Sequence, residues 1–180
     1  ACMSIIRYTT LRLAIEKRIP FVVYGWSPGQ APITSSLMMN NATMLGLMQR
    51  KALAPLHDIV GTAIDPYFLS PEQLKDECEL PWNVHPLAFL GYDEEAIFKA
   101  IKKIGWRPPK DTDANSTNCL LISFANSVHK KQLGFHPYAF ELAGLVRQGY
   151  LDRQTALTRL KEEERPELLS RISTALGLEK

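Results

Sequence analysis

The chain has 180 residues, of which 46% are hydrophobic and 22% are charged, a composition typical of a globular protein with one sizeable core. Its 21 basic and 19 acidic residues leave a net charge of +2, so the overall charge gives no pull towards nucleic acid or an anionic membrane. No apolar run reaches the ~18 to 20 residues of a membrane-spanning helix, and the N-terminus lacks the layout of a secretion signal, so we expect a cytoplasmic protein with no membrane partner.

The N-terminal third predicts a helix, a strand and a loop. Ser4 fits the N-cap of a helix that ends before Pro20, because serine is a favoured cap and proline stops a helix. The run FVVYG at 21–25 is short, apolar and β-branched, which favours a parallel strand buried on both faces. A turn-rich loop, GWSPGQAP, follows it.

The middle of the chain mixes several element types. Residues 34–56 favour one or two helices over strands, because they are rich in Met, Leu and Ala. Ser70 begins a helix-start pattern, SPEQLKDE, and 84–90 fits a second short strand. Asp93 caps a predicted amphipathic helix that Gly105 stops.

The C-terminal part is predicted to be a small orthogonal bundle of helices. A loop at 106–118 precedes it. The predicted helices begin at Ser116 or Thr117, at Pro137, at Asp152 and at Pro166.

The predicted sheet is incomplete. Two strands do not make a stable parallel sheet, yet a strand buried on both faces needs neighbours. Either further strands are hidden in the sequence, or residues outside this chain complete the sheet. The chain also begins with Ala1 and Cys2 before Met3. Its start is therefore processed, artificially added, or internal to a longer protein.

The loop after the first strand is the first candidate site. Its Gly25, Ser27, Gly29 and Gln30 follow the carboxyl end of the strand, where open α/β sheets bind ligands. Glycines allow close backbone approach, the serine and glutamine supply uncharged donors, and Trp26 is a candidate for stacking. The same residues also fit an ordinary turn, and neither of the common nucleotide-binding glycine motifs is present.

The stretch NCLLISFANSVHKKQLGFH raises the question of a metal site. In one continuous helix Cys119 and His129 would be ~15 Å apart, too far to share an ion. They instead belong to one helical stripe with Asn126, and we expect the asparagine and histidine to be hydrogen-bonded in the core. The three cysteines, Cys2, Cys78 and Cys119, are an odd number at wide, irregular spacing, which does not resemble a disulfide framework.

A basic cluster is predicted around the turn QLGFHP. Lys130, Lys131, His136 and Arg147 lie at or near the ends of two predicted helices. Such a cluster suits a phosphate or an RNA backbone. The alternative is a solvated charged face.

Four segments together resemble the later two thirds of the PP-loop ATP pyrophosphatases. The branch it resembles contains N-acetyl sugar amidotransferase-like proteins and is related to tRNA-thiolating enzymes. The likeness covers 4–160, and its segments are YGWSPGQAP, NVHPLAFLGYDEE, GWRPPKDTDANSTNCL and HKKQLGFHPYAFELAGLVRQGYLDRQTAL. It implies an α/β fold: an incomplete parallel-sheet portion of the adenine nucleotide alpha hydrolase-like type at 1–92, followed by a helical domain at 93–180.

The resemblance implies a reaction that consumes ATP with Mg. In the family an N-terminal S-G-G-x-D-S loop binds the phosphates, a substrate oxygen attacks the α-phosphate, and nitrogen or sulfur displaces the adenylate. This chain contains no such loop, so it resembles a C-terminal portion. Gly25, Ser27, Gly29 and Gln30 would border the nucleotide, and the basic cluster would contact a tRNA or sugar substrate. No catalytic residue is assigned.

The resemblance also implies a metal centre and partners. Related thiolation enzymes hold an iron-sulfur cluster with a C-x-x-C pair and one distant cysteine, which Cys2 and Cys119 would represent here. Two cysteines cannot hold that cluster alone, and zinc is the substitute ion. The expected partners are the missing N-terminal portion or a separate chain, and a second copy in a homodimer. The alternative to an enzyme is a silent binding or assembly module that a phosphate-loop partner completes.

Overall fold

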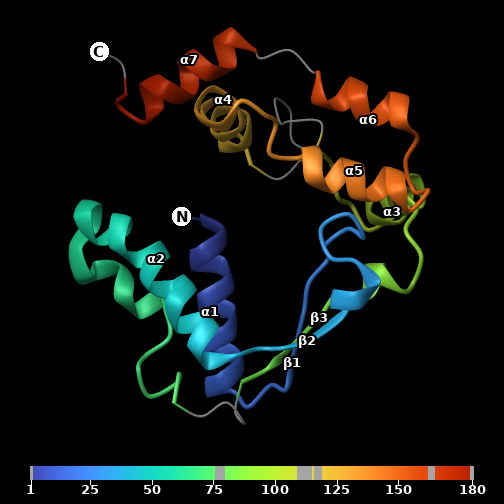
Figure 1. Ribbon diagram of the computed structural model, residues 1–180. Coiled ribbons are helices and arrows are strands. Elements are labelled where there is room, and N and C mark those ends of the chain that lie inside the picture. Colours follow the sequence, from blue (N-terminus) through green and yellow to red (C-terminus); the bar gives the residue numbers. More distant parts are fainter. Residues whose placement is uncertain (1, 76–79, 109–114, 116–118, 162–164, 179–180) are drawn as a thin grey trace. The chain divides into compact units, whose positions relative to one another are not determined.

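The computed structural model describes residues 2–75, 80–108, 115, 119–161 and 165–178 of a mixed α/β chain (Figure 1). The chain divides into two compact units. The first contains Ala1–Trp26 and Ile33–Leu90, and the second contains Ser27–Pro32 and Gly91–Lys180. The short segment Ser27–Pro32 therefore belongs with the C-terminal helices, which a simple division of the sequence into 1–92 and 93–180 does not anticipate.

The first unit combines two long helices with a small sheet. In chain order its elements are α1 (Cys2–Glu16), β1 (Phe21–Val23), the 3-10 helix η1 (Ile33–Ser35), β2 (Leu37–Met39), α2 (Ala42–Val60), the 3-10 helix η2 (Gly61–Tyr67), β3 (Trp82–Val84) and the 3-10 helix η4 (Pro86–Ala88). The prediction of Ser4 as a helix N-cap is wrong, because α1 already begins at Cys2.

The sheet has the strand order β1-β3-β2. β1 runs parallel to β3, as predicted, but β2 runs antiparallel, so the sheet is mixed and the expectation of a purely parallel sheet is wrong. β2 lies inside 34–56, which the sequence favours as helical. β3 begins two residues before the predicted strand, and residues 86–88 form η4 instead. Strands of three residues are too short to show a periodic pattern.

One face of the β1 and β3 pair is covered and the other face of the sheet is open, while Met38 of β2 is 43% exposed on the first face. Val22 of β1 and Asn83 of β3 are buried on the same face, and the adjoining Asn40 exchanges amide hydrogen bonds of 3.1 and 3.0 Å with Asn83. Side chains alternate along a strand, so the opposite face carries Phe21 and Val23, together with Leu37, Met39 and Trp82, all of them 38 to 66% exposed. The prediction that the first strand is buried on both faces is therefore wrong.

The core of the first unit lies between α1, α2 and the segment that follows η2. Leu11 is fully buried among Tyr8, Leu45 and Phe68. The hydroxyl of Tyr8 donates to the carbonyl of Leu45 at 3.0 Å, and its ring lies 5.1 Å from the Phe68 ring. α1 is thus fixed by one apolar side and one buried hydrogen bond.

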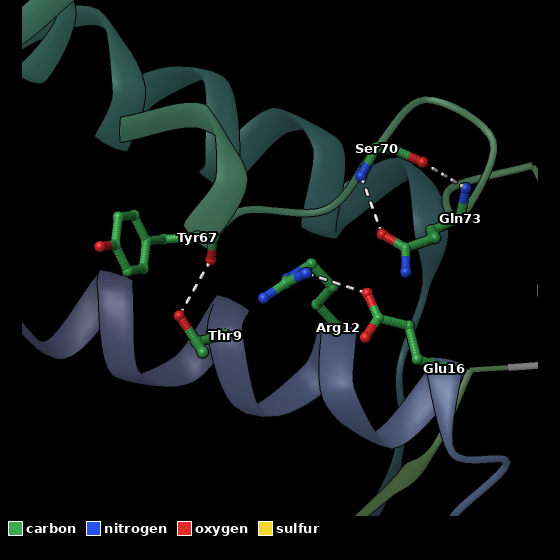
Figure 2. A network of polar contacts seen from close by, with 6 residues as sticks. All are labelled: Thr9, Arg12, Glu16, Tyr67, Ser70 and Gln73. Carbon is green, nitrogen blue, oxygen red and sulfur yellow. Dashed lines mark hydrogen bonds and ion pairs between the residues drawn. The ribbon is translucent and has the colours of Figure 1, made fainter. Parts of the chain in front are cut away.

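One hydrogen bond joins the end of η2 to α1, and a reciprocal pair closes the turn that follows η2 (Figure 2). The hydroxyl of Thr9 donates to the carbonyl of Tyr67 at 3.1 Å. The backbone N–H of Ser70 donates to the Gln73 side chain at 3.0 Å, and the N–H of Gln73 donates back to the Ser70 hydroxyl at 3.3 Å. This reciprocal pair resembles a capping box, but residues 71–75 form turns, and the rest of the predicted helix lies outside the described residues.

The second unit is built from short helices. They are α3 (Glu94–Lys103), α4 (Leu121–Leu133), α5 (Ala139–Arg147), α6 (Arg153–Leu160) and α7 (Pro166–Ala175). Asp93 and Asp152 cap α3 and α6 through hydrogen bonds of 3.0 and 2.8 Å, and Pro166 begins α7, all as predicted. α5 begins two residues after Pro137, and the predicted helix starts at 116 or 117 lie outside the described residues.

The core of the second unit is formed chiefly by α5 and α6. Leu142, Leu145 and Ala156 are buried there, with Tyr92 packed against them. Arg159 of α6 makes a two-pronged ion pair with Glu94 of α3, at 3.2 and 2.5 Å. In the part of the chain that the structure describes, no helix is long and apolar enough to cross a bilayer.

Candidate functional site

The loop after β1 packs against α5 through two glycines. A Cβ on Gly29 would lie 2.2 Å from the carbonyl oxygen of Glu141, and a Cβ on Gly144 would lie 2.9 Å from the backbone of Gly29. Any side chain larger than hydrogen at either position would require the backbones to separate. The glycine of the GWSPGQ motif therefore serves a close backbone contact within the second unit.

Side chains reinforce this contact with hydrogen bonds. The Ser27 hydroxyl donates to the Glu141 carboxylate at 2.6 Å, and the Gln148 amide donates to the carbonyl of Pro28 at 2.9 Å. Within the loop, the backbone N–H of Ser27 donates to the Gln30 side chain at 3.2 Å. Ser27 and Pro28 are buried, so this part of the loop is enclosed as well as hydrogen-bonded.

A pocket of about 410 Å³ opens beside this contact. Its lining is Gly29, Gln30, Asn126, Pro137, Tyr138, Phe140 and Glu141. Amides, a phenol and a carboxyl group therefore surround a space within the size range of small-molecule sites, ~300 to 1,000 Å³. These groups can hold a polar ligand by hydrogen bonds, and the carboxyl can exchange a proton with it.

The electrostatics of this pocket centre on Glu141. Burial raises the pKa of its carboxyl above the ordinary 4.5, while the Ser27 hydrogen bond and, more weakly, Arg159 act in the opposite direction; the negative charge of Glu94 adds to the rise. Desolvation dominates because burial removes the water that stabilises a carboxylate. Glu141 thus holds its proton to a higher pH than an exposed glutamate.

Glu141→Gln should remove a pH-dependent loss of stability. The folded state binds the Glu141 proton more tightly than the unfolded state, so wild-type stability falls as the pH rises from about 4.5 through the raised pKa. Both proteins are unfolded in urea at several pH values from 4 to 8. The free energy of unfolding of the variant should rise relative to that of the wild type as the pH increases. The matched control is Glu167→Gln at an exposed site. A constant difference between Glu141→Gln and wild type would contradict the prediction.

In the first unit, an aromatic group lies at the carboxyl ends of β1 and β3. The Trp26 ring stacks on His85 with centroids 4.7 Å apart and an interplanar angle of 16°, and the Tyr24 ring lies 5.1 Å from that of Trp26. His85 is 2% exposed, and burial lowers its pKa. His85 therefore stacks on the Trp26 ring, where the sequence suggested that a ligand could stack. Gly25, between Tyr24 and Trp26 in sequence, is exposed, and a Cβ there would have nothing within 4 Å.

The predicted basic cluster is divided by the structure. Lys130 and Lys131 lie in the last turn of α4, and the His136 ring follows, accepting a hydrogen bond from the backbone of Tyr138 at 3.2 Å. Arg147 lies at the other end of α5, ~12 Å along the helix axis from its first residue. Three of the four residues therefore share one turn, and the arginine is separate from them.

The predicted cysteine ligands lie in different units. Cys2 is exposed at the first residue of α1, and Cys119 is half-buried just before α4; Cys78 lies outside the described residues. Across the described ranges, no three side chains of His, Cys, Asp or Glu gather as metal ligands would. The iron-sulfur or zinc site of Cys2 and Cys119 therefore stays a prediction, and the function proposed below does not depend on it.

The helical stripe behaves only partly as expected. Asn126 is buried, as expected for the stripe, and it also lines the pocket. The Nε2 atom of His129, however, is buried without a hydrogen-bond partner among the described residues, and the ring packs edge-on to Phe135 at 4.9 Å. The expectation of a fully hydrogen-bonded histidine is wrong for this atom.

Three residues that hold the loop were not identified from the sequence: Glu141, Gly144 and Gln148. A signal was present for one of them, because a glycine inside the helical run ELAGLV is unfavourable unless another backbone approaches closely. The functional assignment rests on these contacts and on the sequence motifs, because comparison of the chain with protein-family models, curated proteins and solved structures gave no match.

Proposed function

We propose that this chain is part of an ATP-dependent enzyme that adenylates an oxygen of its substrate. The substrate oxygen attacks the α-phosphorus of ATP, pyrophosphate leaves, and amide nitrogen or sulfur then displaces AMP on a sugar or tRNA base. The sequence resemblance to the PP-loop ATP pyrophosphatases supports this reaction. In the proposal the first unit is the C-terminal part of an adenine nucleotide alpha hydrolase-like sheet domain.

The structural observation that supports the proposal is the parallel pairing of β1 with β3. Both strands end at the same edge, where the chain continues as the GWSPGQ loop and as His85. Ligands of open α/β sheets bind outside the carboxyl ends of such strands. The exposed Gly25 allows close backbone approach of a ligand at this edge.

The four residues predicted to border the nucleotide divide into two roles. Gly25 and Gln30 are exposed and are available to a nucleotide. Ser27 and Gly29 are engaged with α5, so they position the loop. Lys130, Lys131 and His136 would meet phosphate groups of the substrate. Most of the stabilisation of the reacting phosphates would come from an S-G-G-x-D-S loop and its Mg.

A second candidate is a binding or assembly module that a separate phosphate-loop partner completes. The open side of the sheet favours it. The backbones of Pro20 and Tyr24 are hydrogen-bonded to β3, so the backbone groups of Phe21 and Val23 point to the other edge of β1, which no strand pairs among the described residues. With the exposed apolar face, this edge would accept a strand and an amphipathic helix from another polypeptide, since sheets with parallel strands normally have both faces covered.

Pyrophosphate release from Mg-ATP tests both candidates. The chain alone should release none, and it should become active with a polypeptide that carries a strand followed by an S-G-G-x-D-S loop. The matched control is the same polypeptide with alanines in that loop. Turnover by the 180-residue chain alone would eliminate the module candidate. If the added loop-bearing polypeptide gives neither turnover nor binding of ATP, the enzyme proposal is wrong.

A further inference from the structure

The first unit contains a separate pocket of about 270 Å³ between the N-terminal half of α1, the end of β1 and α2. Met3, Ile6 and Met48 supply apolar walls. The remaining lining side chains are polar or aromatic, and Arg7, Tyr24 and Trp26 are the ones on which the argument depends. No residue of the loop contact on α5 takes part in it.

Arg7 is the only cation that lines this pocket among the described residues. It is half-buried, and it forms no hydrogen bond or ion pair with another described residue. Its charge is felt by the two phenols beside it, because it lowers the pKa of Tyr8 and of Tyr24 against the larger rise that burial causes. A half-buried guanidinium without a counter-charge favours an anion, which it can bind through two parallel hydrogen bonds.

The hydroxyl of Tyr24 is a second unsatisfied group. Its oxygen is inaccessible to solvent and has no hydrogen-bond partner among the described residues. Burying a hydroxyl without a partner is unfavourable. Because solvent does not reach this oxygen, a ligand in the pocket meets the Tyr24 ring and not its hydroxyl.

Aromatic rings form one side of the pocket. Trp26 lines it, and the His85 ring stacks on the Trp26 ring at 4.7 Å. His85 is itself 2% exposed, so the indole is supported by a fixed neighbour. A supported indole beside apolar methionines suits a flat ring, because aromatic rings stack on one another.

We propose that this pocket binds a flat aromatic ring bearing an anionic group, with the anion on Arg7 and the ring against Trp26. A cation is disfavoured by Arg7, and an aliphatic anion would leave the indole unused. The volume lies just below the usual range for ligand sites, ~300 to 1,000 Å³, so one ring system fits and a dinucleotide does not. The anion is a carboxylate on the ring or a phosphate attached through a sugar. The inference does not depend on the proposed adenylation reaction.

Titration calorimetry with four probes tests the proposal at one ionic strength. Nicotinate carries a carboxylate on its ring, uridine monophosphate carries a phosphate on its sugar, and nicotinamide is the neutral match to nicotinate. At least one of the two anions should bind with one molecule per chain. If it is nicotinate, nicotinamide should bind at least about tenfold more weakly, as the loss of a charge-assisted hydrogen bond predicts. Inorganic phosphate, which lacks a ring, should also bind at least about tenfold more weakly.

Variants locate the binding at this pocket. Arg7→Gln should weaken binding of the anion by about tenfold or more. The affinity of Arg7→Lys should fall between those of wild type and Arg7→Gln, since lysine keeps the charge and loses the two parallel hydrogen bonds. Arg50→Gln, at an exposed arginine of α2, should leave the affinity unchanged. Circular dichroism confirms that each variant is folded.

Two results would overturn the inference. One is that neither nicotinate nor uridine monophosphate binds to the folded wild-type protein. The other is binding that is equally tight in Arg7→Gln, which would place the ligand elsewhere. Neither result bears on pyrophosphate release, which is measured with ATP and a loop-bearing polypeptide, so the two proposals fail separately.

Discussion

Gly29→Ala is expected to detach segment Ser27–Pro32 from α5. The new methyl group would lie 2.2 Å from the carbonyl oxygen of Glu141 and 3.0 Å from Leu145, and the first of these atoms belongs to a helix backbone that cannot rotate away. Overpacking of this kind costs ~1 to 3 kcal/mol, and the cost should lie at the upper end. The measurement is the free energy of unfolding in urea, together with the rate of proteolysis within 27–32, which should rise.

Gly25→Ala is the matched control for that variant. It adds the same methyl group to the same loop, where nothing lies within 4 Å. We expect its free energy of unfolding to stay within about 0.5 kcal/mol of wild type, as for most surface substitutions. Equal stability of the two variants would show that the contact between Gly29 and Gly144 does not hold the loop.

Leu11→Ala should have the largest effect on the first unit. Leu11 is fully buried in the core that joins α1 to α2, and replacing a buried leucine with alanine costs ~2 to 5 kcal/mol through lost burial and the cavity left behind. Urea unfolding followed by far-UV circular dichroism should show a lower midpoint. The chain length and the surface exposed on unfolding change little, so the slope of the unfolding free energy against urea concentration should stay similar.

Leu13→Ala on the same helix provides the comparison. Leu13 is 44% exposed, so its truncation removes less buried surface and opens no internal cavity. Both substitutions change helix propensity equally, and the difference between them isolates the packing of α1. A loss for Leu13→Ala as large as that for Leu11→Ala would contradict the described orientation of the helix.

Local chemistry made the starts of α3, α6 and α7 predictable from the sequence. Asp93 and Asp152 cap their helices through the next turn, and Pro166 fits a first helical position. Each signal acts over three or four residues, so it can be read without knowing the fold. The second strand lacked such a signal. Leu37–Met39 suits a helix equally well, and only pairing with Trp82–Val84 makes it a strand.

The candidate site was only half predictable for the same reason. The sequence pointed to Ser27 and Gly29, because glycine and serine after a strand indicate a turn or a ligand loop. Their actual partners are Glu141 and Gly144, more than 100 positions away in the chain. Nothing local to either segment records that pairing. The structure therefore changed the expected role of Ser27 and Gly29 from contacting a ligand to positioning the loop.

The contact of segment Ser27–Pro32 with α5 also constrains how the protein is made. This segment belongs to the second unit, while the chain on either side of it belongs to the first. Synthesis proceeds from the N-terminus, so the hydrogen bond from Ser27 to Glu141 can form only after Glu141 has been synthesised. The loop closed by that pairing spans most of the chain, and closing long loops slows folding. A protease cut at 90/91 would leave the two units still joined through Ser27–Pro32, so neither unit can be released intact by a single cleavage.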